Sequence, residues 1–208
     1  DIIKKRNLTL SKLFIRYNTD KGKYYKRLNF KDKSHNYGPF YEKHFKSLKK
    51  NNLKILEIGA WKGASTAAFH NYFENAIIYA IDINKKIFNF KSDRIKFKKL
   101  DYMNKKQVKK FTDKYKNYFD IIIDDGGHFK SHILNNLKNF FECLKDDSFY
   151  IIEDFGVKFE YLNDNKKEPN IFKVIKNIKT KKNFKSKIIS NKKQNLIMSK
   201  TKQINIYS

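Results

Sequence analysis

The sequence predicts an α/β fold in which helices cover a parallel sheet, and two observations support this. Short apolar runs alternate with amphipathic stretches from Leu53 onward, which is the rhythm of β-α-β units. Hydrophobic residues make up 40% of the chain and aromatic residues 16%, which suits a globular core. A chain of 208 residues is long enough for one ordinary domain. We therefore expect one compact unit, residues 53–208, preceded by a small helical cap, residues 1–52.

The expected strands coincide with the apolar runs, and the expected helices with stretches of helical period. The predicted strands are 54–58, 77–81, 95–100, 119–124 and 149–153. The predicted helices of the larger unit are 64–73, 105–115, 131–144 and 170–176. In the cap, helices are expected at 8–17 and 40–49.

An antiparallel hairpin is expected to close the sheet at its C-terminal end. Two apolar segments, 186–190 and 195–199, flank the polar tetrapeptide 191–194, a spacing typical of two strands joined by a turn. The predicted sheet thus has five parallel strands and a terminal hairpin.

The net charge of +26 raises the question of a nucleic-acid partner. Lysines are spread along the whole chain, however, and arginine, which suits bidentate phosphate and base recognition, is scarce. We therefore expect a small anionic substrate, such as a nucleotide-linked sugar, and no nucleic acid. No apolar run approaches the length of a membrane span, so a cytoplasmic protein is expected. The oligomeric state is open, and a homo-oligomer is compatible with the sequence.

Two glycines stand four residues apart between the first predicted strand and the first helix after it. Residues 56–65 read Leu-Glu-Ile-Gly-Ala-Trp-Lys-Gly-Ala-Ser. Such glycines let the backbone turn tightly and approach a ligand at a helix start. The NAD fingerprint needs a different glycine spacing, whereas E-x-G-x-x-x-G resembles motif I of S-adenosylmethionine methyltransferases. We expect an S-adenosylmethionine site here, with the alternative that Gly59 and Gly63 are ordinary loop glycines.

Acidic residues at the ends of the next strands fit the same cofactor. Asp82 ends the second strand, where a carboxylate can accept both ribose hydroxyl protons; otherwise it is a helix cap. Asp101 follows the third strand and would lie near the adenine, unless it also caps a helix. The residues predicted to bind the cofactor are Glu57, Gly59, Gly63, Ser65, Asp82, Asp101 and Asp124.

Carboxylates also gather at the ends of the fourth and fifth strands. These strands end as Ile-Ile-Ile-Asp-Asp-Gly-Gly-His, residues 121–128, and Tyr-Ile-Ile-Glu-Asp-Phe, residues 150–155. The carboxyl ends of neighbouring strands face the ligand crevice of an open α/β sheet, so several negative charges would converge there. Oxygen ligands without thiolates suit Mg2+ better than Zn2+. The predicted metal ligands are Asp125, Glu153 and Asp154.

His128 completes a possible catalytic group. A metal bound to a substrate hydroxyl lowers its pKa, and an imidazole can then accept the proton as the oxygen attacks a methyl group. We therefore predict His128 as the general base. The alternative is that the carboxylates pair with lysines and that His128 is a structural loop residue.

Six segments together resemble the bacterial class I sugar O-methyltransferases, including metal-dependent enzymes of the macrocin and mycinamicin type and capsule-sugar enzymes. These segments are 17–22, 34–45, 56–59, 71–83, 120–128 and 150–154. The resemblance implies a Rossmann-like class I methyltransferase sheet that binds S-adenosylmethionine and a divalent cation such as Mg2+. In that family the Asp and His of D-G-x-H are a metal ligand and the base, and a Glu-Asp pair supplies further ligands. The resemblance thus implies the roles already predicted for Asp125, His128, Glu153 and Asp154.

Two of the chain's departures from this family concern the predicted site. A Lys- and Tyr-rich insertion, residues 23–33, separates Lys21 from the next motif, and its role is open. Asp101-Tyr-Met replaces the family's frequent Asp-Gln-Ser. Three aromatic side chains of the cap would lie over the cofactor, where they either contact substrate or pack the cap on the sheet. They are His35, Tyr37 and Tyr41.

The predicted function is an S-adenosylmethionine-dependent, divalent-metal-assisted O-methyltransferase. Its acceptor would be a sugar hydroxyl, on a nucleotide-linked sugar or on a capsular or other surface polysaccharide. Two alternatives stay open: an RNA methyltransferase that uses the basic surface, and a non-catalytic interaction protein that keeps the cofactor fold.

Overall fold

A computed structural model of the chain describes residues 8–23, 34–156 and 167–207. All five predicted strands are present, and they are parallel, in the order β3-β2-β1-β4-β5. The contacts within the chain form two compact units, residues 1–99 and 100–208. We describe each unit by itself, and the predicted boundary between residues 52 and 53 stays a prediction.

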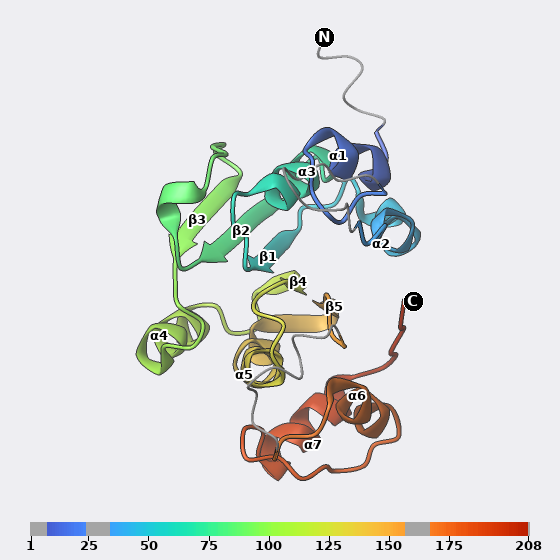
Figure 1. The fold of residues 1–208 in the computed structure, drawn as a ribbon, viewed down its shortest axis with the longest axis vertical. Coiled ribbons are helices and arrows are strands. Elements are labelled where there is room, and N and C mark those ends of the chain that lie inside the picture. Colours follow the sequence, from blue (N-terminus) through green and yellow to red (C-terminus); the bar gives the residue numbers. More distant parts are fainter. Residues whose placement is uncertain (1–7, 24–33, 157–166, 208) are drawn as a thin grey trace. The chain divides into compact units, whose positions relative to one another are not determined.

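The first unit holds three parallel strands and the helices that cover them (Figure 1). Its strands are β1 (Lys54–Ile58), β2 (Ile77–Asp82) and β3 (Ile95–Lys99). Its helices are α1 (Leu10–Arg16), α2 (Gly38–Phe45), α3 (Ala64–Tyr72) and the 3-10 turns η2 (Lys46–Leu48) and η3 (Lys85–Ile87). Apolar residues of β1 and β2 are buried, as the apolar runs predict.

Aromatic packing joins α1, α2 and α3. The ring of Phe69 lies 5.5 Å from that of Phe14 and 5.4 Å from that of Tyr41, both in edge-on geometry. Glu42 on α2 accepts hydrogen bonds from the backbone N–H of Leu10 (2.9 Å) and the hydroxyl of Tyr72 (3.2 Å). Edge-on aromatic pairs and satisfied buried polar groups both stabilise such a junction. The two helices predicted before the first strand are thus present.

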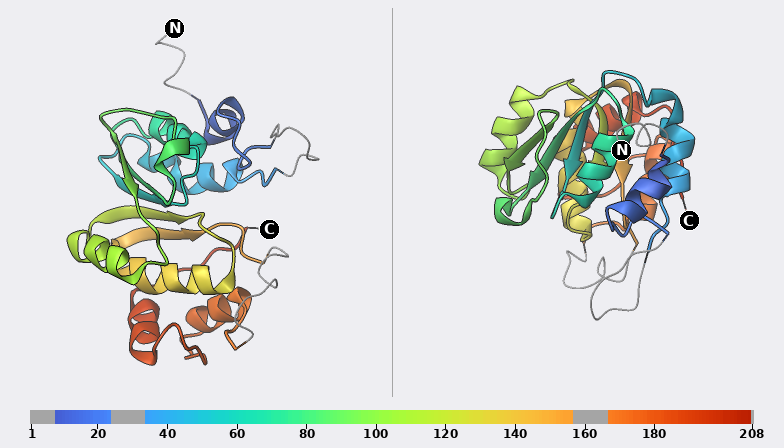
Figure 2. Two further views of the ribbon diagram at one scale, coloured as in Figure 1. Left: turned by 60° about the vertical axis from the view of Figure 1, so that its left-hand side comes forward. Right: turned by 90° about the horizontal axis from the view of Figure 1, so that it is seen from above.

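The second unit pairs β4 with β5 and contains four helices (Figure 2). Its elements are α4 (Lys105–Lys114), β4 (Phe119–Asp124), α5 (Lys130–Phe140), the 3-10 turn η4 (Phe141–Cys143), β5 (Leu144–Ile152), α6 (Ile171–Lys179) and α7 (Asn191–Lys200). Among the described residues, no helix is long and apolar enough to cross a membrane.

Strand β5 begins five residues earlier than predicted. The sequence predicted a helix as far as Leu144, but that residue already pairs with Phe119 of β4. The register then shifts, so that Phe149 pairs with Ile121, and within this irregular part Asp147 has a φ of 55°. Residues between the two pairings form a bulge, which a pattern of apolar residues does not reveal.

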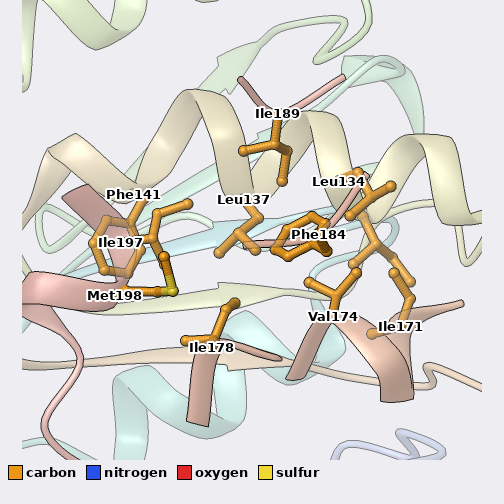
Figure 3. Close-up of a cluster of buried hydrophobic side chains, with 11 residues drawn as sticks. Leu134, Leu137, Phe141, Ile171, Val174, Ile178, Phe184, Ile189, Ile197 and Met198 are labelled. Atoms are coloured by element: carbon orange, nitrogen blue, oxygen red, sulfur yellow. The ribbon is translucent and has the colours of Figure 1, made fainter. Parts of the chain in front are cut away.

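The core of the second unit lies where α5, α6 and α7 meet (Figure 3). Leu134 and Leu137 of α5 pack in one cluster with residues of both later helices. The cluster members from α6 and α7 are Ile171, Val174, Ile178, Ile197 and Met198. Burial of these aliphatic side chains, at roughly 1.5–3 kcal/mol each, is the main term that holds the C-terminal helices in this unit.

The predicted C-terminal hairpin is wrong, because residues 191–200 form helix α7. Ser190 caps this helix, and its hydroxyl accepts a hydrogen bond from the backbone N–H of Lys193. Gln194, Ile197 and Met198 are buried at helical spacing. The polar tetrapeptide that resembled a turn is the first turn of a capped helix, in which Asn191 and Lys192 are exposed whereas Gln194 is buried.

Candidate active site

The turn between β1 and α3 has the left-handed backbone that its glycines permit. Gly59 and Gly63 both have a φ of 83°, and Gly63 is the N-cap residue of α3. The backbone N–H of Gly59 donates to the carbonyl of Ile81 over 2.9 Å, which joins the turn to β2. A Cβ atom on Gly63 would lie only 2.6 Å from Cε2 of Phe88. Both conformation and space therefore require glycine at position 63.

Glu57, fully buried on β1, joins that strand to the first turn of α3. Its carboxylate accepts hydrogen bonds from the hydroxyls of Ser65 and Thr66. A buried carboxylate needs such donors, so the three residues stabilise the turn as a unit. The predicted cofactor contacts of Glu57 and Ser65 stay predictions. The sequence did not predict a role for Thr66, although its hydroxyl follows directly after that of Ser65 and could have suggested one.

Asp82 ends β2 beside the glycine turn. Its Oδ2 accepts a hydrogen bond from the backbone N–H of Trp61 over 2.8 Å, and its Oδ1 accepts one from the N–H of Asn84 over 2.9 Å. An ionised carboxylate offers about four acceptor sites, so these two bonds leave capacity for further donors such as ribose hydroxyls. Asp82 is half-buried, a position that suits a side chain which both fixes a turn and binds a ligand.

Asp101, in the second unit, forms a local turn. Its Oδ1 accepts a hydrogen bond from the backbone N–H of Met103 over 2.9 Å. The residue that caps α4 is Asn104, whose side chain accepts from the N–H of Gln107. Asp101 therefore precedes the cap and does not replace it, and its contact with adenine stays a prediction.

Asp124 is buried at the end of β4. Its Oδ1 accepts a hydrogen bond from Nδ2 of Asn136 over 2.8 Å, whereas its Oδ2 has no partner among the described residues. Burial above all, and the negative charge of Glu153 to a smaller extent, raise the pKa of the Asp124 carboxyl to about 7, although the hydrogen bonds from Asn136 and Gly126 oppose this rise. A carboxyl group with this pKa is partly protonated at neutral pH. Its predicted role in cofactor binding is not tested by these contacts.

Three predicted site residues come together at the ends of β4 and β5. One ligand atom each from Asp125, His128 and Asp154 lies within 4.8 Å of the others, and all three residues are half-buried. The pairing of the two strands explains this, since Asp124 is opposite Ile152 and the N–H of Glu153 donates to the Asp124 carbonyl over 2.9 Å. The residues that follow β4 and β5 therefore lie at the same edge of the sheet.

The backbone at Asp154 is strained in a way that is frequent at functional sites. Its φ of 52° lies in the left-handed region, which costs a residue with a side chain about 1–2 kcal/mol. This conformation turns the chain directly after β5, where Asp154 joins the group with Asp125 and His128. We name these three residues the Asp-His-Asp cluster.

The Asp-His-Asp cluster fits a divalent cation. Ligand atoms on opposite sides of an octahedral Mg2+ ion are about 4.2 Å apart, so a separation within 4.8 Å needs only small side-chain movements. Asp125 and Asp154 offer the carboxylate oxygens that Mg2+ prefers, whereas the nitrogen of His128 suits Zn2+ or another transition metal better. In a Mg2+ site, His128 is therefore better suited to act beside the metal than to bind it.

Glu153, the third predicted ligand, is not a member of the Asp-His-Asp cluster. It is 4% exposed, and its charge acts on the carboxyl group of Asp124. Its role as a metal ligand stays a prediction.

The predicted substrate-side residues differ in their surroundings. Tyr41 is 1% exposed within the aromatic packing of α1, α2 and α3, which is the packing alternative that the sequence left open. His35 and Tyr37 are half-buried, and their rings stack at 5.2 Å. Their backbone N–H groups donate to the carbonyls of Asp20 and Lys21, each over 2.8 Å. The motifs on either side of residues 24–33, which lie outside the described part, are therefore joined.

Comparison with protein families matches residues 40–204 to the FtsJ-like methyltransferases. The chain belongs to the FtsJ-like methyltransferase family. The matched range contains the glycine turn, Asp82 and the Asp-His-Asp cluster. Family membership and the strand order confirm the predicted Rossmann-like class I methyltransferase fold.

Individual relatives of this FtsJ-like chain are O-methyltransferases, by their names. The demethylmacrocin O-methyltransferase of Streptomyces fradiae is 28% identical over 132 residues, which cover 60% of this chain and 33% of the relative. The mycinamicin VI 2''-O-methyltransferase of Micromonospora griseorubida has the same identity and coverage. The chain thus spans about a third of the length of these curated relatives. The predicted resemblance to macrocin- and mycinamicin-type enzymes is confirmed.

A solved structure shows the same relationship. The MycE methyltransferase from the mycinamycin biosynthetic pathway, crystallised with Mg and SAH, superposes with a TM-score of 0.60 at 28% sequence identity. The match covers 73% of this FtsJ-like chain and 40% of that enzyme.

Proposed function

We propose that this protein is an S-adenosylmethionine-dependent, divalent-metal-assisted O-methyltransferase that methylates a sugar hydroxyl. The observation that carries the proposal is the Asp-His-Asp cluster, which combines two carboxylates suited to a metal with one group suited to a proton. Membership of a methyltransferase family and the Mg and SAH of the MycE crystals support it.

In this proposal the first unit binds the cofactor through the glycine turn. The left-handed backbone at Gly59 and Gly63 opens the start of α3 to a ligand, and Asp82 accepts hydrogen bonds from the ribose. Glu57 keeps the turn in shape through its bonds to Ser65 and Thr66.

The second unit supplies the groups that act on the acceptor. A bound divalent cation would lower the pKa of a substrate hydroxyl. Asp125 and Asp154 would hold this cation, with Glu153 as a further predicted ligand. His128 then accepts the hydroxyl proton while the oxygen gains the methyl group and the bond from that methyl to sulfur breaks. Each group of the Asp-His-Asp cluster thus has a defined role.

The acceptor sugar is proposed to be carried by an anionic group. With a net charge of +26, the protein attracts anions at long range, an effect that falls as salt rises. A nucleotide-linked sugar or an anionic capsular or surface polysaccharide has the matching charge. The named relatives act on demethylmacrocin and mycinamicin VI, so compounds of this kind are the natural comparison.

A panel of acceptors tests this proposal. We expect mass spectrometry to show a gain of one methyl group on at least one nucleotide-linked sugar when protein, S-adenosylmethionine and Mg2+ are combined. Neutral macrolide glycosides and a mixed-sequence RNA serve as the other arms. Methylation of RNA alone, or of no sugar in a broad panel, would contradict the sugar assignment.

A further inference from the structure

Tyr102 reaches the loop that connects Asp125 to His128. Its hydroxyl accepts a hydrogen bond from the backbone N–H of Gly127 over 2.6 Å. The same hydroxyl lies 3.3 Å from Nδ1 of His132. A phenol has one proton to donate, so Tyr102 can accept from Gly127 and donate to His132 at the same time. The three residues form a short chain of hydrogen bonds within the second unit.

Gly127 lies too close to Tyr102 and His132 to carry a side chain, and Gly126 has little space beside Tyr102. A Cβ atom on Gly127 would be 2.3 Å from Nδ1 of His132 and 2.9 Å from the Tyr102 oxygen. A Cβ atom on Gly126 would be 3.3 Å from Cζ of Tyr102. The backbone of Gly126 and Gly127 thus packs directly against the ring of Tyr102. These two glycines lie between Asp125, a proposed metal ligand, and His128, the proposed base.

The ring of His132 contacts two neighbouring aromatic rings. Its ring centroid lies 5.6 Å from that of Tyr102 and 5.1 Å from that of Phe129, both in edge-on geometry. His132 belongs to the first turn of α5, which begins at Lys130. The helix start therefore fixes His132, His132 orients the phenol, and the phenol fixes the backbone of Gly127.

We propose that Tyr102 and His132 are positioning residues for the loop that carries Asp125 and His128. The inference rests on the proposed function, because it assigns that loop to metal binding and proton transfer. Neither residue touches substrate in this account. They act by holding a backbone N–H, as partners outside a metal's own ligands commonly do, with a loss of about 10- to 100-fold in metal affinity when removed.

The test is a titration of the purified full chain with Mn2+, followed by electron paramagnetic resonance. Tyr102→Phe removes one oxygen atom and keeps the ring. We expect it to weaken Mn2+ binding by about tenfold or more, while the Kd for S-adenosylhomocysteine and the Tm change little. Tyr118→Phe is the matched control, because Tyr118 directly precedes the opposite end of β4 and should leave Mn2+ binding unchanged.

His132→Ala is the second variant, and it tests the inference if Tyr102→Phe does not fold. We expect it to weaken Mn2+ binding by about fivefold or more, because the phenol loses its orientation. Wild-type Mn2+ affinity in a folded Tyr102→Phe chain, or in His132→Ala if the first does not fold, would overturn the inference and leave the proposed function intact. If the wild-type chain binds no Mn2+, the metal site and the inference fall together.

Discussion

Replacing His128 with alanine is expected to lower kcat by about a hundred- to ten-thousandfold, the range for loss of a general base. The variant keeps Asp125 and Asp154, the proposed metal ligands, and leaves unchanged the glycine turn that we propose binds the cofactor. We therefore expect the Kd for S-adenosylhomocysteine to stay within about twofold of wild type, measured by calorimetry, while turnover is nearly abolished. His44→Ala is the control and should leave kcat unchanged, since the ring of His44 packs at a tilt against that of Phe40 on α2 and neither residue is assigned a role in catalysis.

The same variant separates the two roles that the Asp-His-Asp cluster allows for His128. If His128 is a base, Mn2+ binding should survive in His128→Ala with a change of a few-fold at most. If His128 is a ligand, loss of one of three protein ligands should weaken Mn2+ binding by about a hundredfold. Near-normal turnover in this variant would exclude His128 as the base.

Gly63→Ala is expected to abolish measurable cofactor binding and to lower the Tm by several degrees. A side chain at a φ of 83° costs about 1–2 kcal/mol, and the new Cβ would lie 2.6 Å from Phe88. The turn must move to relieve both, which carries the N–H groups at the start of α3 out of place. Calorimetry with S-adenosylhomocysteine and thermal unfolding measure the two effects.

The double variant Gly63→Ala with Phe88→Ala provides the control. It removes the ring that the new methyl group would meet, so it should recover part of the Tm lost in the single variant relative to Phe88→Ala alone. Cofactor binding should stay weak, because the left-handed backbone is still disfavoured. Wild-type affinity in the single variant would show that the turn does not bind the cofactor.

The sequence was sufficient to predict the parts of this fold that depend on local patterns. Strands β1 and β4 have the predicted bounds, because each is a buried and mostly apolar run, which Gly59 follows in β1 and which Asp124 ends in β4. Asp125, His128 and Asp154 could be brought together because parallel strands end at one edge of a sheet. A positional rule of this kind needs no knowledge of side-chain packing.

Features that depend on tertiary contacts were not predictable. The bulge that lets β5 begin at Leu144 and the capped helix α7 both contradict a purely local pattern. Tyr102 and His132 were not assigned to the site, because their contact spans 30 residues of sequence and neither has a motif of its own. Tyr102 acts on the backbone N–H of Gly127, and a contact with backbone cannot be recognised from the types of the residues involved.

Removal of divalent cations tests the central claim most directly. We predict that turnover with an accepted sugar falls by roughly two orders of magnitude after treatment with EDTA and dialysis, and that added Mg2+ restores it. The variant with Asp125→Asn and Asp154→Asn should stay inactive after Mg2+ is added, although it should still bind S-adenosylhomocysteine. Full turnover by the metal-free wild-type chain would contradict the proposed mechanism.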